Sequence, residues 1–484
     1  LAIELAAARV KLFSPQALLS RLEKSLSALG SGTRDAPARQ QTLRGAILWS
    51  YDMLDTGDRR LLARFSVFAR GSNLEQVEPV CGPAEDIGGD VIDSLDQLAD
   101  QSLLRRLPDF DEPRFLMLQT IRDFAAERLE ESGEAPLIHN RHVKAYITLA
   151  QQAQPHLFGP RRKEWLDRVE EDHDNFRAAL DWTVASGDAR SAMELSAGMW
   201  RFWQMRGHLY EGRRRMAEVL AMPASREYAR ERLHALEAAG GLAYWQADME
   251  TAQGLYDECL QLTRPLGDES ALANALYNAA FPRLVNRSAI HEAVALLEEA
   301  LPLFRKLGDE SGIARCLWGL GNARYFSRDY GAARPLLEEA EALNRKLDDQ
   351  FGLGWTMHTL GLVALNLGDL DRARRAWGEA IRLFEAAGDV PGLVLQLDNM
   401  SVLSRMDGDP MRAARLAAAS STYQATSGTG LGHLLREQEG RTGREGLTDQ
   451  EAAEAWAQGQ AMTLGQAVAY ALEGVHASER TPDG

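Results

Sequence analysis

The sequence between residues 190 and 423 repeats itself at a period close to 40 residues. A turn signal that ends in aspartate recurs at this period, and a second turn lies between each pair of such signals. Two turns per period, with apolar residues at helical spacing between them, predict helix–turn–helix units stacked in series. One small position of the unit recurs at steps of 41, 40, 40 and 40 residues, at Ala252, Ala293, Ala333, Ala373 and Ala413.

The small residues of each unit predict where its two helices cross. Helices approach closely only where neither has a bulky side chain, so we expect Gly321 and Gly361 to contact the following helix near Ala333 and Ala373. One pair of helices cannot bury its apolar face alone, so neighbouring pairs must stack. This pattern resembles the tetratricopeptide repeat, although the period is longer than the usual length of about 34 residues. We therefore expect a mostly α fold with an α-solenoid.

Composition excludes several other classes of protein. The chain has 484 residues and a formal net charge of −16, which opposes non-specific attraction to nucleic acid or to an anionic membrane. No apolar run reaches the length of about 18 residues that predicts a membrane span. The three cysteines, Cys81, Cys259 and Cys316, are far apart and predict reduced core thiols. We expect a cytoplasmic protein without a membrane partner.

Several phrases near the start of the chain resemble one family. These are the helix from Leu1 to Ala8, the segment from Thr42 to Tyr51 and the segment from Phe115 to Leu129. They are similar to the part of NB-ARC-like (STAND) signal-transduction ATPases that follows the ATPase core, as found in bacterial LuxR-like and cyclase-associated regulators. The resemblance implies an ATPase core before Leu1 that binds ATP or ADP and is a partner of this chain. The chain itself contains no phosphate loop of the Gly-x4-Gly-Lys-Ser/Thr form.

The predicted domain organisation has six parts. Before the repeats come a helical linker, a winged-helix-like domain and a helical connector. After them we expect a glycine-rich segment with two capping helices, opened by Thr448 and Thr463, and a disordered tail. In chain order the boundaries are 1–55, 56–132, 133–189, 190–423 for the repeats, 424–475 and 476–484.

The winged-helix-like domain is predicted to lack DNA contacts. Helices are expected over 74–81 and 87–101, and a two-stranded wing over 103–107 and 114–118. The helix over 87–101 corresponds to a recognition helix, but it has no Lys or Arg before Arg105. Phosphate contacts need cations. Asp86, Asp90, Asp93, Asp96 and Asp100 lie in or beside this helix, so we expect a structural or regulatory use.

No catalytic or metal-binding set stands out in the sequence. His139 and His142 have the spacing His-x-x-His, but no third ligand is near. Paired carboxylates such as Glu298 and Glu299 are predicted to lie on solvated helix faces. We therefore expect no enzyme activity, no metal and no cofactor within this chain.

Candidate binding residues come from the phase of the repeat. In tetratricopeptide repeats the first helix of each pair lines a concave groove, and the resemblance places one groove position every 40 residues. Polar or aromatic side chains at such positions suit the recognition of a protein, a peptide or a small effector. The alternative is that Trp318 and Tyr325 only pack and that His358 is merely exposed. The candidates are Asn278, Trp318, His358 and Asp398, then Asn322 one turn later, and also Tyr244, Trp245, Tyr325 and Asn366.

These observations predict a regulatory sensor arm. An effector in the groove would change how the winged helix packs on the ATPase core and thereby control a transcriptional or signalling output. Two alternatives stay open at this point: a regulatory tail of an enzyme such as a nucleotide cyclase or protein kinase, and a plain protein–protein scaffold.

Overall fold

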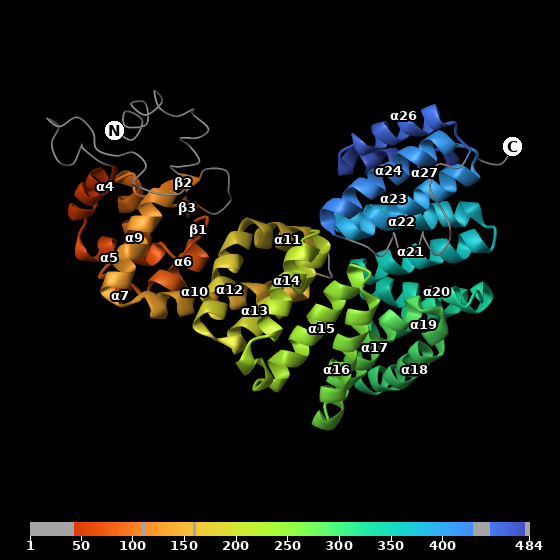
Figure 1. Cartoon of the computed structure of the whole chain (residues 1–484), viewed down its shortest axis with the longest axis horizontal. Coiled ribbons are helices and arrows are strands. Elements are labelled where there is room, and N and C mark those ends of the chain that lie inside the picture. The colour runs from red at the N-terminus through yellow and green to blue at the C-terminus, as the bar shows by residue number, and fades with distance from the viewer. Residues whose placement is uncertain (1–42, 108–112, 158–160, 429–445, 480–484) are drawn as a thin grey trace. The chain divides into compact units, whose positions relative to one another are not determined.

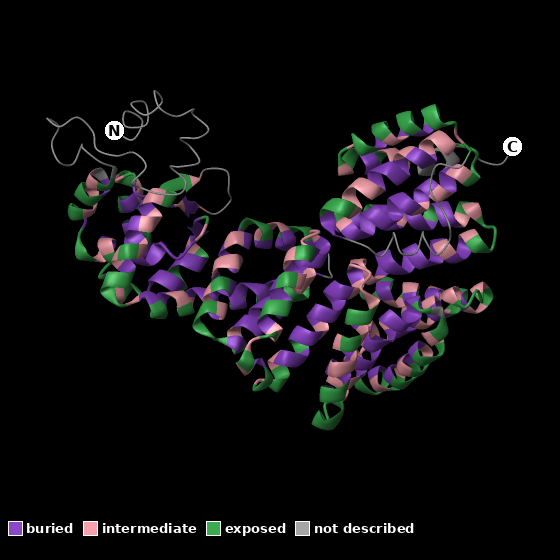
Figure 2. Cartoon of the chain, in the orientation of Figure 1, coloured by how far each residue is buried: buried purple, intermediate pink, exposed green. Residues whose placement is uncertain are grey.

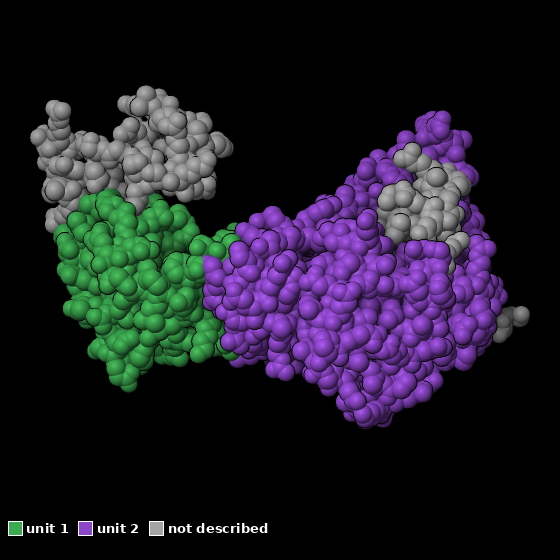
Figure 3. All heavy atoms as spheres, turned by 60° about the horizontal axis from the view of Figure 1, so that its bottom comes forward, with its two compact units in different colours: residues 1–149, 171–186 green, residues 150–170, 187–484 purple. Residues whose placement is uncertain are grey.

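The computed structural model describes residues 43–107, 113–157, 161–428 and 446–479 (Figure 1). They form two compact units, coloured separately in Figure 3: the first contains residues up to 149 and 171–186, and the second contains 150–170 and 187 onward. The helix predicted from Leu1 to Ala8, the rest of the linker up to residue 42 and most of the glycine-rich segment lie outside the described residues.

The first unit combines helices with a small sheet. The strands are antiparallel in the order β1-β3-β2, with Ser72 opposite Phe115 and Arg106 opposite Phe115 on the other side. Its elements are α4 (Leu43–Asp52), α5 (Thr56–Phe65), β1 (Ser72–Asn73), α6 (Leu74–Cys81), α7 (Ala84–Ile87), α8 (Val91–Asp100), β2 (Arg105–Leu107), β3 (Arg114–Leu116), α9 (Gln119–Ser132), α10 (Ala135–Ala153) and α12 (His173–Ser186).

Two details of this unit differ from the sequence prediction. The wing has a third strand, β1, which is only two residues long and therefore gives no alternating pattern in the sequence. The helix predicted over 87–101 is α8, which begins only at Val91, and a separate short helix, α7, ends at Ile87. Gly88 ends α7 in the left-handed conformation at φ 79°, and Asp90 then caps α8 by accepting the N–H of Ile92 at 2.7 Å.

A buried polar cluster joins α12 to the sheet of the first unit. Arg114 on β3 donates to Asp172 at 2.8 Å, and the Tyr146 hydroxyl donates to the same carboxylate at 3.2 Å. The Asn175 amide donates to the Gly71 carbonyl at 2.9 Å. Because a buried charge is tolerated only when it is paired, this cluster fixes α12 in the first unit. The connector predicted over 133–189 is therefore shared between the two units.

The second unit is a series of helical hairpins that wind around one concave side (Figure 1). The first helix of a hairpin has more buried residues than the second, as in the pairs α17–α18 and α23–α24, and buried residues are purple in Figure 2. Its elements are η2 (Gln154–His156), α11 (Arg162–Glu171), α13 (Ala189–Met205), α14 (Leu209–Leu220), η3 (Pro223–Arg226), α15 (Ala229–Trp245), α16 (Met249–Thr263), η4 (Arg264–Leu266), α17 (Glu269–Val285), η5 (Arg287–Ala289), α18 (Ile290–Leu307), α19 (Glu310–Phe326), α20 (Tyr330–Lys346), α21 (Gln350–Asn366), α22 (Leu370–Ala387), α23 (Val390–Met406), α24 (Pro410–Ser427), α26 (Asp449–Gln460) and α27 (Leu464–Glu479).

The small positions of the repeat are the places where the helices cross, as the sequence predicts. The five recurring alanines are at most 1% exposed. A Cβ added at Gly321 would lie 2.7 Å from the Leu337 side chain, and one added at Gly361 would lie 2.2 Å from Trp377 Nε1. Such distances are too short for any side chain, so glycine at these positions allows the two helices of a hairpin to pack.

Aspartate is the N-cap of most helices of the solenoid, including all of those from α19 to α24. Asp329, for example, accepts the N–H of Ala332 at 3.2 Å, and Asp369 accepts that of Arg372 at 3.0 Å. The residue before the aspartate is left-handed, as at Gly368 (φ 82°) and Arg328 (φ 61°). The recurring turn signal is thus a helix C-cap followed directly by an N-cap. The same aspartate cap occurs at Asp248, Asp268, Asp309, Asp349, Asp389 and Asp409.

Two helices cover the end of the solenoid. Thr448 opens α26 with a complete capping box, and Thr463 and Gln466 exchange equivalent bonds at the start of α27. Helix α27 continues to Glu479, so the first residues of the tail predicted to be disordered are helical instead. The three cysteines are buried and free, as predicted. Among the residues that the structure describes, no helix is both long and apolar enough to cross a membrane.

Candidate functional site

The concave side of the second unit holds a partly open cavity of about 1130 Å³. Its wall is formed mainly by the first helix of successive hairpins, α15, α17, α19, α21 and α23, with further residues from α13, from second helices such as α16 and α20, and from the turns between helices. The repeat phase decides which side chains reach this wall, because residues 40 positions apart occupy equivalent places on neighbouring hairpins.

All nine residues that the sequence proposes for the groove line this cavity. Four of them, Asn278, Trp318, His358 and Asp398, occupy the same place on four successive inner helices. The other five are Tyr244, Trp245, Asn322, Tyr325 and Asn366. The structure thus brings the whole predicted set together, and their use in binding stays a prediction.

Aromatic rings form a continuous apolar strip in the cavity wall. The ring of Phe281 lies 5.7 Å from Tyr244 and 5.5 Å from Trp318, measured between ring centroids. The indole of Trp245 lies 4.9 Å from that of Trp355. Trp318 is fixed by its indole N–H, which donates to the Thr359 hydroxyl at 3.0 Å. This strip can bury the apolar body of a ligand.

His358 is buried, in contrast to the alternative that it is merely exposed. Only 8% of its surface is exposed, and its Nδ1 lies 2.8 Å from the Gln396 amide and 3.0 Å from the Asn399 amide. Burial lowers the pKa of His358 to about 4, so the ring is neutral near pH 7. Its carbonyl also accepts the Trp377 indole N–H at 3.0 Å. His358 therefore organises the wall between α21, α22 and α23.

The polar candidates are held in place by hydrogen bonds of their own. Asn278 donates to Glu237 at 2.9 Å. Asn322 and Asn366 each donate back to the carbonyl one turn earlier in their own helix, at 2.9 and 2.8 Å. Asp398 accepts from Gln424 at 3.1 Å. These bonds fix the orientation of polar groups around an otherwise aromatic wall, which is the composition expected of a small-ligand site.

Two arginines of the wall were missed by the sequence analysis. Arg201 lies on α13, with its Cζ atom 3.7 Å from the Trp200 ring centroid and 5.4 Å from that of Phe351. Burial lowers the pKa of Arg201 to about 10. Arg315 lies on α19, one turn before Trp318, and its Cζ is 5.0 Å from the Tyr277 ring. The repeat phase around Trp318 could have indicated Arg315, whereas Arg201 precedes the regular repeats.

The superhelix curves so far that its two ends contact each other. Arg162 on α11 donates to the Leu383 carbonyl of α22 at 3.1 Å, across more than two hundred residues of sequence. A Cβ at Gly207 would lie 2.9 Å from that of Ser427, and one at Gly428 would lie 2.7 Å from the Tyr210 ring. The first and last hairpins of the solenoid are therefore in direct contact.

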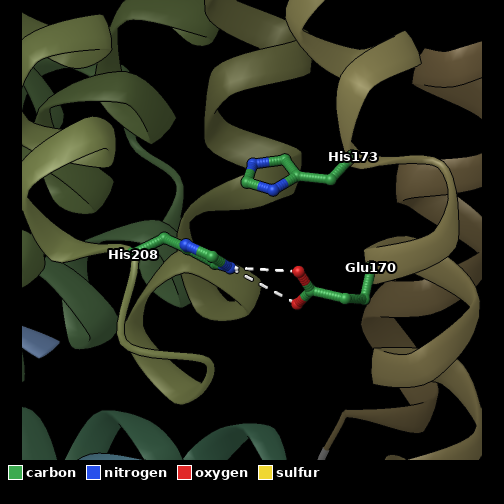
Figure 4. A group of neighbouring side chains, drawn as sticks. All are labelled: Glu170, His173 and His208. Atoms are coloured by element: carbon green, nitrogen blue, oxygen red, sulfur yellow. Dashed lines mark hydrogen bonds and ion pairs between the residues drawn. The ribbon is translucent and has the colours of Figure 1, made fainter. Parts of the chain in front are cut away.

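A second contact joins α11 to the start of α14 in the same unit. His208 Nε2 lies 3.3 Å from both carboxylate oxygens of Glu170 (Figure 4). His173, which Figure 4 also labels, belongs to the first unit. Both side chains of the pair are partly exposed, so this contact adds little to stability.

The two histidines of the His-x-x-His motif pack against aromatic rings of the first unit. His139 stacks on Trp182 at 4.1 Å, and His142 lies 4.7 Å from Tyr146. His142 is 1% exposed, and burial lowers its pKa to about 3. His142 is therefore a buried ring in the first unit, and His139 is a half-buried ring stacked on Trp182.

The exposed face of α8 is acidic. Asp93, Asp96 and Asp100 are exposed, and the apolar side of the helix, with Leu95 and Leu98, is fully buried. A helix with this face would repel the phosphates of a DNA duplex.

Models of known domain families match one segment in each of the two units. Residues 54–130 match the model of the winged helix-turn-helix domain. The first unit contains a winged helix. Residues 289–346, which include α18, α19 and α20, match the model of the tetratricopeptide repeat. The chain is therefore a winged helix followed by a tetratricopeptide-type α-solenoid.

Two mycobacterial proteins are similar in sequence. The "Putative HTH-type transcriptional regulator Rv0890c" of Mycobacterium tuberculosis is 32% identical over 285 residues, which cover 57% of this chain and 32% of that protein. The "Uncharacterized protein Rv0894" of the same species is 32% identical over 145 residues, which cover 30% of this chain and 37% of that protein. The chain thus matches about a third of the length of these relatives.

Solved structures with some likeness include two helical-repeat proteins. One is the Signal Transduction ATPase with Numerous Domains protein with a tetratricopeptide repeat sensor from Pyrococcus horikoshii, at 14% identity and a TM-score of 0.44, covering 98% of this chain and 72% of that one. The other is a Rap protein complexed with competence and sporulation factor, at 14% identity and a TM-score of 0.43, covering 70% of this chain and 98% of that one.

Proposed function

We propose that this chain is the regulatory part of a transcription or signalling regulator and that its repeat cavity binds an effector. The observation that carries the proposal is the partly open cavity of about 1130 Å³ with an aromatic strip and fixed polar groups. Small-molecule sites in proteins commonly have volumes of about 300–1,000 Å³. The volume therefore suits a small molecule or a short peptide segment.

The output of the regulator is proposed from the similar proteins. The relative named as a transcriptional regulator shares 32% identity over 285 residues, which supports a role in transcription. The resemblance to STAND ATPases supports a core that binds ATP or ADP in the longer protein, with this chain as its sensor. In this proposal the chain acts by binding and not by catalysis. The acidic face of α8 supports a DNA reader located elsewhere.

A cavity-filling variant tests the proposal. Asn366 is exposed, lines the cavity and donates only to its own helix among the bonds described, so Asn366→Trp narrows the cavity at little structural cost. Peptides and metabolites are screened for a rise in the melting temperature of the full chain. We expect N366W to abolish the rise that a binder causes. Glu339→Trp, on the exposed side of α20, is the matched control and should retain it.

Two results would contradict the proposal. One is a ligand-induced rise that N366W and E339W retain equally, since the ligand would then bind outside the cavity. The other is measured in the longer protein with the proposed ATPase core, as a rate of nucleotide exchange that a bound effector leaves unchanged. Binding in the cavity would then not control the ATPase.

A further inference from the structure

The two ends of the second unit meet at a seam, with α11 and the end of α13 on one side and the turns before α21 and α23 on the other. Arg162 of α11 donates from Nη2 to the Leu383 carbonyl near the end of α22 at 3.1 Å. Its Cζ atom lies 5.8 Å from the centroid of the Phe351 ring, in the first turn of α21. A Cβ added at Gly388 would lie 3.5 Å from Nη1 of Arg206, the residue directly after α13. Residues of α11 and α13 therefore cover both turns.

This cover buries an aspartate whose equivalent in an earlier hairpin is exposed. Asp389 caps α23 as Asp268 caps α17, through one carboxylate oxygen that accepts a backbone N–H. Asp268 is exposed, whereas Asp389 is fully buried and its Oδ2 atom has no hydrogen-bond partner in the described structure. Burial also raises the pKa of the Asp389 carboxyl, and the charge of Arg162 opposes this rise. Closure of the superhelix therefore removes the hydration of this carboxylate.

Arg162 is also buried with incomplete hydrogen bonding. It is 2% exposed, and its Nε and Nη1 atoms have no hydrogen-bond partner in the part of the chain that the structure describes. Burial lowers the pKa of its guanidinium, and the carboxylates of Asp389 and Asp349 oppose this change. Asp349 caps α21, and burial raises the pKa of its carboxyl as well. Because water would hydrate these groups in an open seam, the closed form gains little from them.

Other charges near the seam have contacts of their own. Arg206 donates to Asp167, and both residues lie on the side of α11 and α13, so their ion pair does not join the two sides. Arg201 of α13 reaches the Phe351 ring across the seam, with its Cζ atom 5.4 Å from the centroid. Arg162 combines such a ring contact with a hydrogen bond across the seam. It is therefore the residue through which the seam can be tested.

Contacts between successive hairpins are of a different kind. Phe384 on α22 is fully buried, and a Cβ added at Gly354 or at Gly392 would lie 2.8 or 2.7 Å from its ring. The ring thus packs against both α21 and α23. Apolar burial of this kind stabilises more than buried charges with incomplete hydrogen bonds. The seam is therefore the place where the superhelix opens at the lowest cost.

We infer that this seam is a latch: the second unit opens where Arg162 meets the end of α22, and the opening admits the ligand to the cavity. Both sides of the seam contribute to the cavity wall, with Trp200 on α13 and with Leu395 and Asn399 on α23. A ligand that contacts both sides stabilises the closed form, because it binds that form more tightly than the open one. This inference rests on the proposed function, since it describes how the same cavity is filled.

The latch acts on the segment that links the two units. Residues 150–170, which include Arg162, belong to the second unit, and the chain then continues into α12 of the first unit. Asp172 anchors this continuation by accepting from Arg114 at 2.8 Å. Opening of the seam moves α11, while Asp172 stays fixed in the first unit. Occupancy of the cavity thereby changes the connector.

The test measures how fast a cysteine inside the cavity is modified in the full chain. Asn322→Cys places a thiol in the cavity wall, and the reagent is fluorescein maleimide. The three native cysteines are buried, and the chain without N322C gives their background rate. Arg162→Met removes the bond and the charge at the seam. It should raise the modification rate about fivefold or more, because this rate follows the population of the open form.

Controls separate the seam from general effects of substitution. Ala342→Cys, exposed on α20, should react equally fast with and without R162M. Arg161→Met removes an exposed charge at the preceding position and should leave the rate of N322C unchanged. Arg162→Lys keeps the charge but is shorter, so it should raise the rate by less than R162M, and it decides the test if R162M does not fold. In hydrogen–deuterium exchange we expect R162M to expose amides of α11, with α12 and α19 as protected as in the parent chain.

The outcomes separate this inference from the proposed function. Modification rates in R162M and R162K equal to that of N322C alone would overturn the latch and keep the cavity as the binding site. A faster rate together with lost protection in α12 or α19 would also overturn the latch, because the chain would then be unfolding. A faster rate with these helices protected supports the latch. If no ligand then shows the loss of binding expected for N366W, the proposed function alone fails.

Discussion

The indole rings of Trp245 and Trp355 contact each other at 4.9 Å, with an angle of 52° between their planes. Their helices, α15 and α21, are separated in the chain by two complete hairpins. In an open solenoid a repeat contacts only its neighbours. The contact therefore shows how tightly this solenoid curves, and this curvature gives the concave side its cavity of about 1130 Å³.

A double-mutant cycle on these two tryptophans tests whether their rings contact each other in solution, as the curvature of the solenoid requires. Trp245→Ala and Trp355→Ala should destabilise the chain by less in combination than the sum of their single effects, with a coupling of about 0.5–1.5 kcal/mol. The measurement is chemical denaturation of all four forms. Trp165, which stacks on His156 at 4.8 Å, is the control partner, and its cycle with Trp245 should be additive. Additivity of the Trp245–Trp355 cycle would mean that the rings do not meet.

A methyl group added at a crossing glycine should destabilise the solenoid. Gly361→Ala places a Cβ 2.2 Å from Trp377 Nε1, and relief of this clash should cost about 1–3 kcal/mol. Gly254→Ala is the control, because nothing lies within 4 Å of its added Cβ in α16. There the change should stabilise by about 0.5–1 kcal/mol through helix propensity. Urea denaturation measures both, and equal effects would contradict the close crossing.

Glycine should be preferred at a left-handed turn where the chain has alanine. Ala247 has φ 64°, a conformation that costs a residue with a Cβ about 1–2 kcal/mol. Ala247→Gly should therefore raise the free energy of unfolding by roughly 1 kcal/mol. Gly267→Ala reverses the chemistry at a left-handed turn between two hairpins, φ 70° with open space around it, and should lower stability by a similar amount. Stabilisation by both changes would be inconsistent with these turn conformations.

The sequence predicts the hairpins and the cavity residues well because both follow from periodicity. Small residues at Ala333 and Gly361 define where helices cross, and this fixes which side chains face the concave side. Asn278, Trp318 and Asp398 follow from that phase together with the resemblance to the tetratricopeptide repeat, which assigns the first helix of each pair to the concave side.

Other features depend on packing that no local pattern encodes. Closure through Arg162 and Leu383 results from small rotations that accumulate over all the hairpins. Arg201 lies on α13 in the irregular first hairpin. The period of the repeat therefore could not assign Arg201 to the cavity wall. The buried state of His358 depends on its contact with Gln396 of the next hairpin. Following one position through successive repeats does not reveal such a contact.

Buried histidine makes the second unit sensitive to acid. The pKa of His358 falls from 6.5 to about 4 on folding, so below pH 6.5 the unfolded chain binds a proton that the folded chain does not. Stability is therefore full above pH 6.5 and declines as the pH falls towards 4. At pH 5 the loss from this residue should be about 2 kcal/mol.

Substitution of this histidine tests the origin of the acid sensitivity. His358→Gln removes the titrating ring, so the difference in unfolding free energy between pH 7 and pH 5 should shrink by about 2 kcal/mol. Urea denaturation at the two pH values measures it. His234→Gln, at an exposed position, should leave the difference unchanged. An unchanged difference in H358Q would show that His358 is not buried and neutral.

Hydrogen–deuterium exchange on the full chain tests most directly whether the repeat cavity is the ligand site. The ligand with the largest thermal shift in the screen is added at saturating concentration, and amide exchange is compared with that of the free chain. The account predicts slower exchange in α15, α17, α19, α21 and α23, whose side chains line the cavity. Protection confined to α26 and α27 or to the winged helix, with these inner helices unchanged, would contradict it.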